Sequence, residues 1–314
     1  MYNIGIDMMG GDYAPREAVA GVQLFLQQSH STPVHLTLFG NEDEIQNQLQ
    51  SYSVDTNRIT IVPTTEVIEM NEHPTKALKQ KQNSSISVGF QYLAQNKIDG
   101  FISAGNTGAM LVGTMFSIKA IEGVIRPTIS SLMPKHNGSM GLIVDVGINA
   151  DCKPEFLNQF ALMGSIYAKE MLNIENPKIG LMNVGEEEGK GNTLLQNTYP
   201  LLKNNSKINF IGNIEGRDVF NEKADVIVCD GITGNIILKL AESIYDIKVK
   251  EAINNDYLSR FNFELYGGTP VLGVEKPVII GHGISKSTAF VNMIHTATLM
   301  LEKDVLAKVK IALA

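Results

Sequence analysis

Short runs of β-branched and apolar residues alternate with helical patterns along almost the whole chain. We predict strands over Tyr2–Asp7, Val34–Phe39, Arg58–Val62, Ile98–Ser103, Met140–Val146, Lys178–Val184, Lys207–Ile211, Asp225–Cys229 and Pro277–Ile280. The predicted helices are Arg16–Gln28, Ser84–Gln95, Asn106–Lys119, Pro154–Leu172, Asn192–Leu202, Asn235–Ala252 and Ser285–Lys308. Strands that alternate with helices predict an α/β fold, in which a mainly parallel sheet has helices on both faces.

The length of 314 residues suits one large α/β unit or two joined lobes. The chain contains no internal repeat, low-complexity tract or linker rich in proline and serine. Residues 1–314 are therefore expected to form a single catalytic unit. If that unit has two lobes, residues 121–139 are the best candidate for the connection between them.

The composition argues against several classes of protein. No apolar run reaches the roughly 18 residues of a membrane span, and the N-terminus resembles a strand and not a signal peptide. A net charge of −7 argues against general nucleic-acid binding. Cys152 and Cys229 have no cysteine or histidine at metal-binding spacing, so we expect no metal site and a reducing, cytoplasmic location.

Polar loops that contain glycine follow six of the predicted strands. These loops are 7–12, 104–108, 147–154, 185–192, 212–218 and 230–235. Each loop taken alone is best explained as a turn or a helix cap. The C-terminal ends of parallel strands meet at one edge of a sheet, however, and ligands bind there. Six such loops together therefore predict a shared site.

Two of these loops, Gly105–Gly108 and Gly231–Asn235, are predicted to open helices. Glycine lets a backbone approach a ligand closely, and a helix N-terminus offers free N–H groups and a positive dipole end. Together these features predict a phosphate site where the two loops meet. Lys76 and Lys79 share a helix face and form either a local anion-binding patch or a solvated basic face.

Other familiar sites are missing from the sequence. Val184 stands where a phosphate-loop consensus ending at Gly189-Lys190 requires glycine. The segment 281–286 lacks the third glycine of a dinucleotide fingerprint, and no Gly-x-Ser-x-Gly motif is present. No cofactor is therefore expected.

Several short motifs occur in order along the chain. They are Asp7-Met8-Met9-Gly10-Gly11-Asp12, Ser103-Ala104-Gly105-Asn106-Thr107-Gly108-Ala109, Asp145-Val146-Gly147, Lys153-Pro154-Glu155, Asn183-Val184-Gly185, Asp230-Gly231-Ile232-Thr233-Gly234-Asn235 and Tyr266-Gly267-Gly268. This ordered set resembles the motifs of the PlsX-type phosphate acyltransferases of bacterial phospholipid synthesis. The resemblance covers nearly the whole chain. It implies a fold like that of phosphotransacetylases and isopropylmalate-type dehydrogenases.

The resemblance also implies a function. The family transfers a fatty acyl group from acyl carrier protein to inorganic phosphate and supplies the acyl phosphate to a membrane glycerol-3-phosphate acyltransferase. Its members are usually homodimers, so a homodimer is expected here. Two alternatives stay open: a phosphotransacylase that uses acyl-coenzyme A, and a catalytically inactive scaffold for lipid synthesis.

Attack by an ionised phosphate on a thioester needs little acid or base help, so we expect positioning and oxyanion stabilisation to dominate. The catalytic candidates are Lys153, Asn149, Asp230 and Asn235. The candidates for substrate binding are Asp7, Gly10, Gly11, Asp12, Lys76, Lys79, Gly105, Asn106, Thr107, Gly108, Lys190, Arg217, Gly231, Thr233, Gly234, Lys239 and His282.

The sequence departs from the family in three places. Phe156 stands where histidine is common, and Lys79-Gln80 stand where arginines are usual. The segment 243–266 is shorter than the family's helical hairpin. An apolar stripe begins before this segment and continues into its first residues. We interpret the stripe as core packing; its members are Ile236, Ile237, Leu240, Ala241, Ile244 and Ile247. We therefore expect at most weak, peripheral membrane binding.

Overall fold

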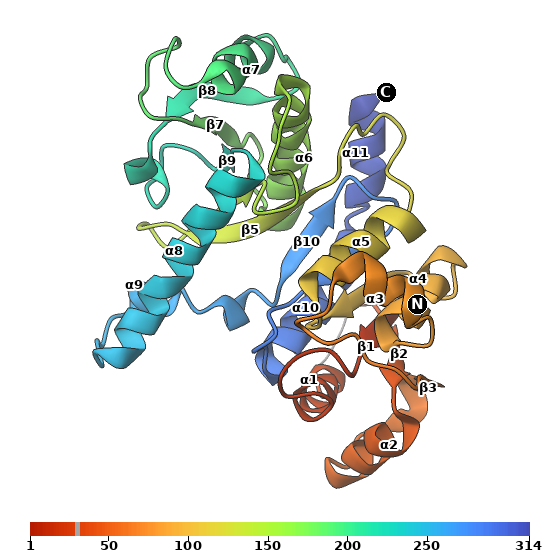
Figure 1. The fold of residues 1–314 in the computed structure, drawn as a ribbon. Helices are drawn as coiled ribbons and strands as arrows, with labels where there is room; N and C mark the ends of the chain where they lie inside the picture. Colours follow the sequence, from red (N-terminus) through yellow and green to blue (C-terminus); the bar gives the residue numbers. More distant parts are fainter. Residues whose placement is uncertain (29–31) are drawn as a thin grey trace. The chain divides into compact units, whose positions relative to one another are not determined.

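The computed structural model describes residues 1–28 and 32–314, and these residues form two compact units (Figure 1). Unit 1 comprises Met1–Lys119 and Phe263–Glu302. Unit 2 comprises Ala120–Asn262 and Lys303–Ala314. Each unit has its own group of strands, its own helices and its own buried apolar side chains.

The sheet of unit 1 has the strand order β3-β2-β1-β4-β11-β10. Its strands are β1 (Tyr2–Asp7), β2 (Val34–Gly40), β3 (Ile59–Pro63), β4 (Gly100–Ser103), β10 (Thr269–Leu272) and β11 (Val278–Ile280). Neighbouring strands run parallel, except that β10 is antiparallel to β11. The chain runs outward from β1 to β3 and then returns to β4 on the other side of β1. Because crossovers are right-handed, this reversal places helices on both faces of the sheet.

Four of the helices of unit 1 form two packed pairs over its sheet. The helices of this unit are α1 (Arg16–Leu26), α2 (Glu42–Ser51), α3 (Pro74–Gln80), α4 (Ser85–Ala94), α5 (Thr107–Ser117) and α10 (Ser287–Glu302), with short 3-10 turns at Thr56–Arg58 and Phe263–Leu265. Helix α1 packs against α10, and α4 packs against α5. A Cβ on Gly89 of α4 would lie 2.3 Å from the ring of Phe101 on β4, so this glycine lets the helix lie close to the sheet. Burial of each large apolar side chain in this core contributes about 1.5–3 kcal/mol.

The sheet of unit 2 has the strand order β5-β6-β9-β7-β8. Its strands are β5 (Thr128–Pro134), β6 (Met140–Val144), β7 (Lys178–Met182), β8 (Asn209–Ile214) and β9 (Val226–Val228). Strand β5 is antiparallel to β6, and the other neighbours run parallel. Its helices are α6 (Pro154–Leu172), α7 (Thr193–Lys203), α8 (Gly231–Lys250), α9 (Asp256–Ser259) and α11 (Val305–Leu313), with a 3-10 turn at Gly216–Asp218. The mainly parallel sheets confirm the predicted α/β class.

Several predicted elements were wrong. The predicted helix Ser285–Lys308 is two helices, because Asp304 adopts a left-handed conformation with φ of 51° between α10 and α11. Two antiparallel strands, β5 and β10, and helix α2 were not predicted. Strand β5 occupies residues 128–134 of the segment 121–139, which was considered as a connection between lobes. Helix α8 begins at Gly231, four residues before its predicted start.

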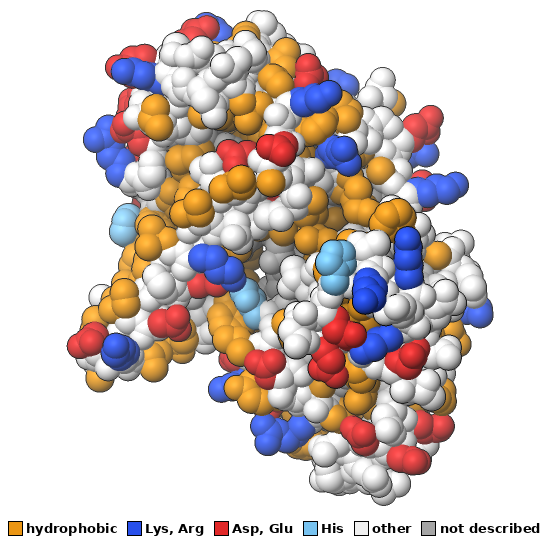
Figure 2. Space-filling view, viewed as in Figure 1, with side chains coloured by type: hydrophobic (Ala, Val, Ile, Leu, Met, Phe, Trp, Pro, Cys, Tyr) orange, Lys and Arg blue, Asp and Glu red, His pale blue; other side chains and the backbone are white. Residues whose placement is uncertain are grey.

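The interpretation of the α8 stripe as core packing was also wrong. Ile236, Leu240 and Ile247 are 62%, 67% and 54% exposed. Ala241 is the one residue of the predicted stripe that is buried. Apolar side chains are visible along the surface of α8 in Figure 2. No helix within the described residues combines the length and apolar character required to cross a membrane.

Candidate active-site loops

In unit 1, a buried carboxylate connects the loops that follow β1 and β4. Asp7 is fully buried, and its Oδ1 accepts hydrogen bonds from the N–H groups of Met9 and Gly10 at 3.0 and 3.1 Å. Ser103 Oγ donates to Asp7 Oδ2 at 2.6 Å, and Gly105 N donates to Ser103 Oγ at 2.9 Å. Burial raises the pKa of the Asp7 carboxyl, and the hydrogen bonds from Ser103 and the backbone offset only part of this increase. Asp7 therefore positions the loop and is not exposed to a ligand.

Glycines at positions 10 and 105 allow these two loops to touch. A Cβ on Gly10 would lie 2.6 Å from Gly105 N, so no side chain fits there. The next loop residue, Gly11, has φ of +99°, and Asp12 N donates to Gly283 O at 2.7 Å. The loops after β1 and β4 thus meet at one edge of the unit 1 sheet, as the sequence predicts, and the loop after β11, which was not among the predicted loops, joins them there.

Asn106 caps helix α5 and uses its whole side chain to do so. Its Oδ1 accepts from Ala109 N at 2.9 Å, and its Nδ2 donates to the carbonyl oxygens of Glu69, Met70 and Glu72. The carboxamide is therefore a structural clamp. The N–H groups of Thr107 and Gly108 form no hydrogen bond within the described part of the chain, so they are available to a ligand.

The predicted lysines lie on the short helix α3, beside this loop. Lys76 and Lys79 are exposed, and neither forms an ion pair with a described residue. A Cβ on Gly108 would lie 2.3 Å from the Pro74 ring, so the missing side chain lets the start of α3 pack on the first turn of α5. His282 is half-buried, and its ring lies 4.5 Å from that of Phe263.

Unit 2 has a second buried carboxylate, Asp145, directly after β6. It accepts from the N–H groups of Gly147, Ile148 and Asn149 at 3.1, 3.2 and 2.7 Å. The Asn149 carboxamide donates to Asp145 Oδ2 and to Pro127 O. Asn149 was predicted to be catalytic, but this geometry uses its Nδ2 to hold the loop in place.

The first turn of α8 packs directly on that loop. Gly231 N donates to Asn149 O at 2.8 Å, and Asp230 accepts from Thr233 N at 2.9 Å and Thr233 Oγ1 at 2.7 Å. A Cβ on Gly234 would lie 1.8 Å from Asp145 O. Gly231 and Gly234 therefore allow the backbone of α8 to pack closely on the backbone of the Asp145 loop. From the sequence we had instead expected these glycines to let the backbone approach a ligand.

The two helix N-termini differ in electrostatic character. Helix α5 is capped by a neutral carboxamide and leaves two N–H groups free. Helix α8 is capped by the carboxylate of Asp230. Among the first three residues of α8, Ile232 is the one whose N–H forms no hydrogen bond with the described residues. Because a carboxylate repels an anion, the α5 terminus is the better phosphate site.

The predicted cations of unit 2 also differ from one another. Lys190 pairs with Glu187, Lys239 with Glu242, and Arg217 with both Glu186 and Glu215. Lys153 is exposed at the start of α6 and has no ion pair among the described residues. The Asn235 carboxamide is exposed beside Gly147. Of the four cations predicted in unit 2, Lys153 is therefore the one that forms no ion pair with a described carboxylate.

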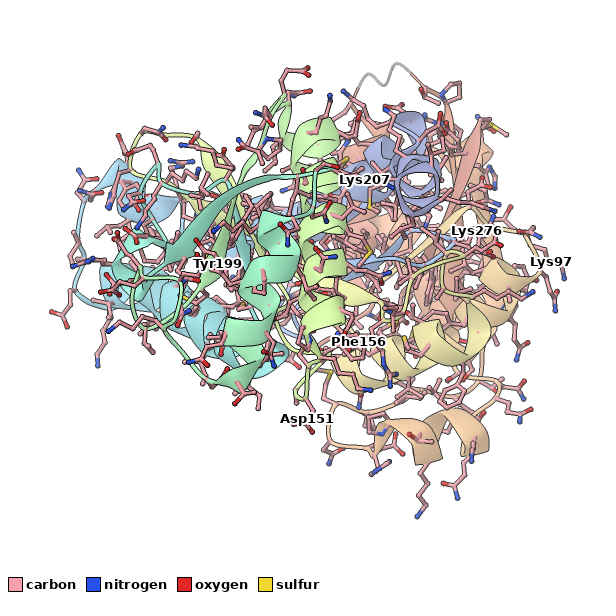
Figure 3. All side chains as sticks on the ribbon, turned by 90° about the horizontal axis from the view of Figure 1, so that it is seen from above. Lys97, Asp151, Phe156, Tyr199, Lys207 and Lys276 are labelled. Carbon is pink, nitrogen blue, oxygen red and sulfur yellow. The ribbon has the colours of Figure 1, made fainter. Side chains whose placement is uncertain are left out.

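The ring of Phe156 is buried in the first turn of α6, and Asp151 lies in the loop that precedes this helix (Figure 3). The Arg126 guanidinium lies 5.9 Å from its centroid. Phe156 stands where the family commonly has histidine, and here the position contributes packing and a cation–π contact.

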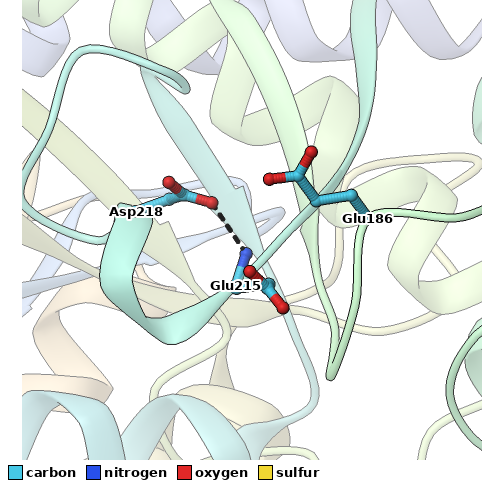
Figure 4. A group of neighbouring side chains, drawn as sticks. All are labelled: Glu186, Glu215 and Asp218. Atoms are coloured by element: carbon cyan, nitrogen blue, oxygen red, sulfur yellow. Dashed lines mark hydrogen bonds between the residues drawn. The ribbon is translucent and has the colours of Figure 1, made fainter.

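Three carboxylates at the same sheet edge form the described cluster most suited to a metal: Glu186, Glu215 and Asp218 (Figure 4). Lys223 binds Glu186 and Asp218 at 2.7 and 3.0 Å. Arg217 pairs with Glu186 and Glu215. These two cations already form ion pairs with all three carboxylates, so the geometry of the cluster gives no reason to assign a metal.

Cys152 is the residue near the α8 N-terminus that most resembles a nucleophile. Its thiol donates to Asn149 O at 3.4 Å. Burial, together with the charges of Asp145 and Asp230, raises its pKa from 9.0 to about 12. A thiol with this pKa is protonated near neutral pH, which argues against a covalent acyl-cysteine intermediate.

We expect alkylation of Cys152 by iodoacetamide at pH 8 to be on the order of a thousandfold slower than that of an unperturbed thiol, because the thiolate fraction falls tenfold per pKa unit. Mass spectrometry of timed samples measures the rate, which should rise about tenfold per pH unit from pH 8 to pH 10 without levelling off, because the pKa of the Cys152 thiol is about 12. The same chain unfolded in urea is the control. Rapid alkylation of the folded chain at pH 7 would contradict the raised pKa.

Comparison with known proteins identifies the family. Residues 2–308 match the family described as "Fatty acid synthesis protein". The phosphate acyltransferase of Dictyoglomus turgidum is 43% identical over 325 residues, which span 98% of this chain and 96% of that protein. The phosphate acyltransferase of Dictyoglomus thermophilum is 44% identical over the same shares of the two chains.

Solved structures show the same fold at low sequence identity. A phosphotransacetylase from Streptococcus pyogenes superposes with a TM-score of 0.68 at 17% identity, covering 96% of this chain and 94% of that one. A branched-chain phosphotransacylase from Enterococcus faecalis gives 0.64 at 13% identity, covering 96% and 99%. The predicted phosphotransacetylase-like fold is confirmed. A family match over nearly the whole length, with relatives of 43% and 44% identity, establishes that the chain belongs to the fatty acid synthesis protein family of PlsX-type phosphate acyltransferases.

Proposed function

We propose that the protein transfers a fatty acyl group from acyl carrier protein to inorganic phosphate and so forms acyl phosphate. The observation that carries the proposal is the N-terminus of α5, where the Thr107 and Gly108 N–H groups are free and the cap is neutral. Two exposed lysines, Lys76 and Lys79, lie in the same unit. Incubation with palmitoyl-acyl carrier protein and phosphate should therefore yield acyl phosphate.

The chemistry requires little from the protein beyond binding and orientation. A phosphate oxygen attacks the thioester carbonyl, the new C–O bond forms, and the C–S bond breaks to release a thiolate. A thiol with a pKa near 8.5 is a good leaving group, and phosphate is largely ionised near neutral pH. The α5 N–H groups would stabilise the negative charge of phosphate or of the developing oxyanion. This limited need for acid or base catalysis agrees with a site in which polar side chains such as Asn106 and Asn149 form hydrogen bonds that fix the loops.

In this proposal, Lys76 and Lys79 make the protein prefer acyl carrier protein to coenzyme A as the carrier of the acyl group. Acyl carrier proteins are acidic, and a basic patch on a chain with a net charge of −7 would attract such a partner locally. Lys79 and Lys76 are candidates for this contact because both are exposed and neither has an ion-pair partner in the described structure. Comparison of rates with acyl carrier protein and coenzyme A thioesters separates the two carriers.

We expect Lys76→Glu/Lys79→Glu to raise the Michaelis constant for carrier protein or phosphate about tenfold or more, since one lost charge-assisted hydrogen bond costs about 1.5–3 kcal/mol. The salt dependence of that constant should also weaken. Steady-state kinetics at low and moderate salt measures both effects.

The matched control is Lys97→Glu/Lys276→Glu, which makes the same change of charge. These lysines, labelled in Figure 3, precede β4 and β11 and so lie at the other edge of the unit 1 sheet. Equal effects of the two double variants would show a response to net charge alone and would rule out a specific role for α3.

We further propose that the exposed apolar face of α8 joins two copies of the chain. Ile236, Leu240 and Ile247 repeat at helical spacing, and interfaces of homodimers are richer in apolar area than ordinary surfaces. Leu240→Glu should convert the dimer to monomer in sedimentation velocity. A wild-type chain that sediments as a monomer, or a dimer that Leu240→Glu leaves intact, would contradict this assignment.

A further inference from the structure

Unit 1 contains a pocket of about 350 Å³ between α3, α4 and α5. Leu78 of α3, Phe90 of α4 and Val112 of α5 form apolar parts of its wall. Phe90 and Gly113 are buried, whereas Phe116 at the end of α5 is 81% exposed. The volume lies in the range of small-molecule sites, which are about 300–1,000 Å³.

Ser87 is the buried polar side chain among the lining residues, and it does not need a polar ligand. The Ser87 hydroxyl donates to Lys81 O at 2.8 Å and accepts from Ser84 Oγ at 2.8 Å. No described lining residue has a buried side-chain polar atom without a hydrogen-bond partner. Among these residues, Lys79 carries the only charge, and it is exposed. The chemistry of the pocket is therefore an apolar interior with a cation at its solvent side.

The pocket lies close to the free N–H groups of α5. Pro74 at the start of α3 packs on Gly108, and the next residue, Thr75, lines the pocket. Val112 is one turn beyond Gly108, which is about 6 Å along a helix axis. One amphiphilic molecule can thus place its polar head at the α5 N-terminus and its tail in the pocket.

We propose that this pocket binds the hydrocarbon tail of the fatty acyl group, with Lys79 facing the anionic end of the substrate or product. The inference deepens the proposed function and rests on it. Its basis is the combination of an apolar wall, a buried Ser87 whose hydroxyl already forms hydrogen bonds, a single cation, and one helical turn of separation from an anion-binding terminus. A flexible alkyl chain with an anionic head is the ligand that these features suit.

The test uses alkyl phosphates of increasing chain length as stable probes, with binding measured by calorimetry below their micelle concentrations. In the wild-type chain, affinity should rise about fourfold with each added methylene until the pocket is full, as expected for burial of apolar groups. Val112→Trp should fill the pocket and remove this dependence on length. Leu78→Phe is a second, smaller obstruction and should shorten the chain length at which affinity stops rising.

The matched control is Met115→Trp, because Met115 is an exposed residue of α5 that does not line the pocket. It should keep the wild-type dependence on chain length. Lys79→Gln should weaken every alkyl phosphate by a similar factor and leave the increase per methylene unchanged. Thermal melts of all variants establish that they are folded.

Two results would overturn the assignment. One is a wild-type affinity that does not change with chain length. The other is an unchanged dependence in folded Val112→Trp and Leu78→Phe. The proposed function fails in a different way: the chain would bind long alkyl phosphates as expected and yet form no acyl phosphate from any acyl thioester. The two failures are therefore distinguishable.

Discussion

Gly234→Ala is expected to lower the free energy of unfolding by about 3 kcal/mol or more, at the upper end of the overpacking range, and to abolish turnover. The new Cβ would lie 1.8 Å from Asp145 O and 2.9 Å from Cys229 Sγ. The first obstacle is a backbone oxygen, and the Asp145 loop is fixed by hydrogen bonds from Gly147, Ile148 and Asn149. Helix α8 must therefore move away from the loop. Chemical denaturation and a turnover assay measure the two effects.

Gly216→Ala is the matched control. Gly216 begins a helical turn after β8, at the same edge of the unit 2 sheet, and a Cβ there would meet no atom within 4 Å. The change should alter stability by less than about 1 kcal/mol. If Gly234→Ala were as well tolerated as Gly216→Ala, close packing of α8 on the Asp145 loop would be wrong.

Lys135→Ala is expected to cost about 3–5 kcal/mol, because it leaves a carboxylate without its partner in a mostly buried position. Lys135 Nζ lies 2.6 Å from Asp225 Oδ1, and the two side chains are 3% and 14% exposed. Asp225 Oδ2 also accepts from Lys178 N at the start of β7. The ion pair thus connects β5, β7 and β9 at the edge opposite to the candidate site. Urea denaturation measures the loss.

The surface pair of Lys308 and Glu170 provides the comparison for this prediction. Its atoms lie 2.7 Å apart, but the lysine side chain is 43% exposed. Lys308→Ala should cost no more than about 1 kcal/mol, because water screens exposed pairs. Equal losses for Lys135→Ala and Lys308→Ala would show that burial does not set the strength of the Lys135 pair.

The fold class could be predicted because hydrophobic periodicity is a local property of the sequence. Most strands and helices were recognised, and the positions of the glycine loops followed from the parallel sheet. The break at Asp304 could not be predicted, because apolar spacing continues across it and a single left-handed residue leaves no periodic signal. The exposed face of α8 was misjudged for a related reason: an apolar stripe looks the same whether a core or a second molecule covers it.

The sequence could predict which loops form the candidate site, but it could not predict what each side chain in those loops does. Asp7 was expected to touch substrate and is a buried positioning group, and Asp145 was not among the candidate residues at all. Both aspartates lie at the C-terminal end of a strand and accept hydrogen bonds from backbone N–H groups two and three residues ahead, a spacing that can be recognised in a sequence. The pairing of Arg217 with Glu186 depends on tertiary structure, which spacing alone does not specify, whereas Lys239 and Glu242 are an i, i+3 pair within α8 that spacing could have indicated.

The most direct measurement of the central proposal is the fate of the acyl group when the protein is mixed with palmitoyl-acyl carrier protein and labelled inorganic phosphate. We predict that the label enters an acyl phosphate, which hydroxylamine converts to palmitoyl hydroxamate, and that one free carrier thiol appears for each product formed. Palmitoyl-coenzyme A should react more slowly at equal concentration, and Lys76→Glu/Lys79→Glu should reduce the difference between the two carriers. Release of free palmitate without incorporation of label, or no consumption of either thioester, would contradict the proposal.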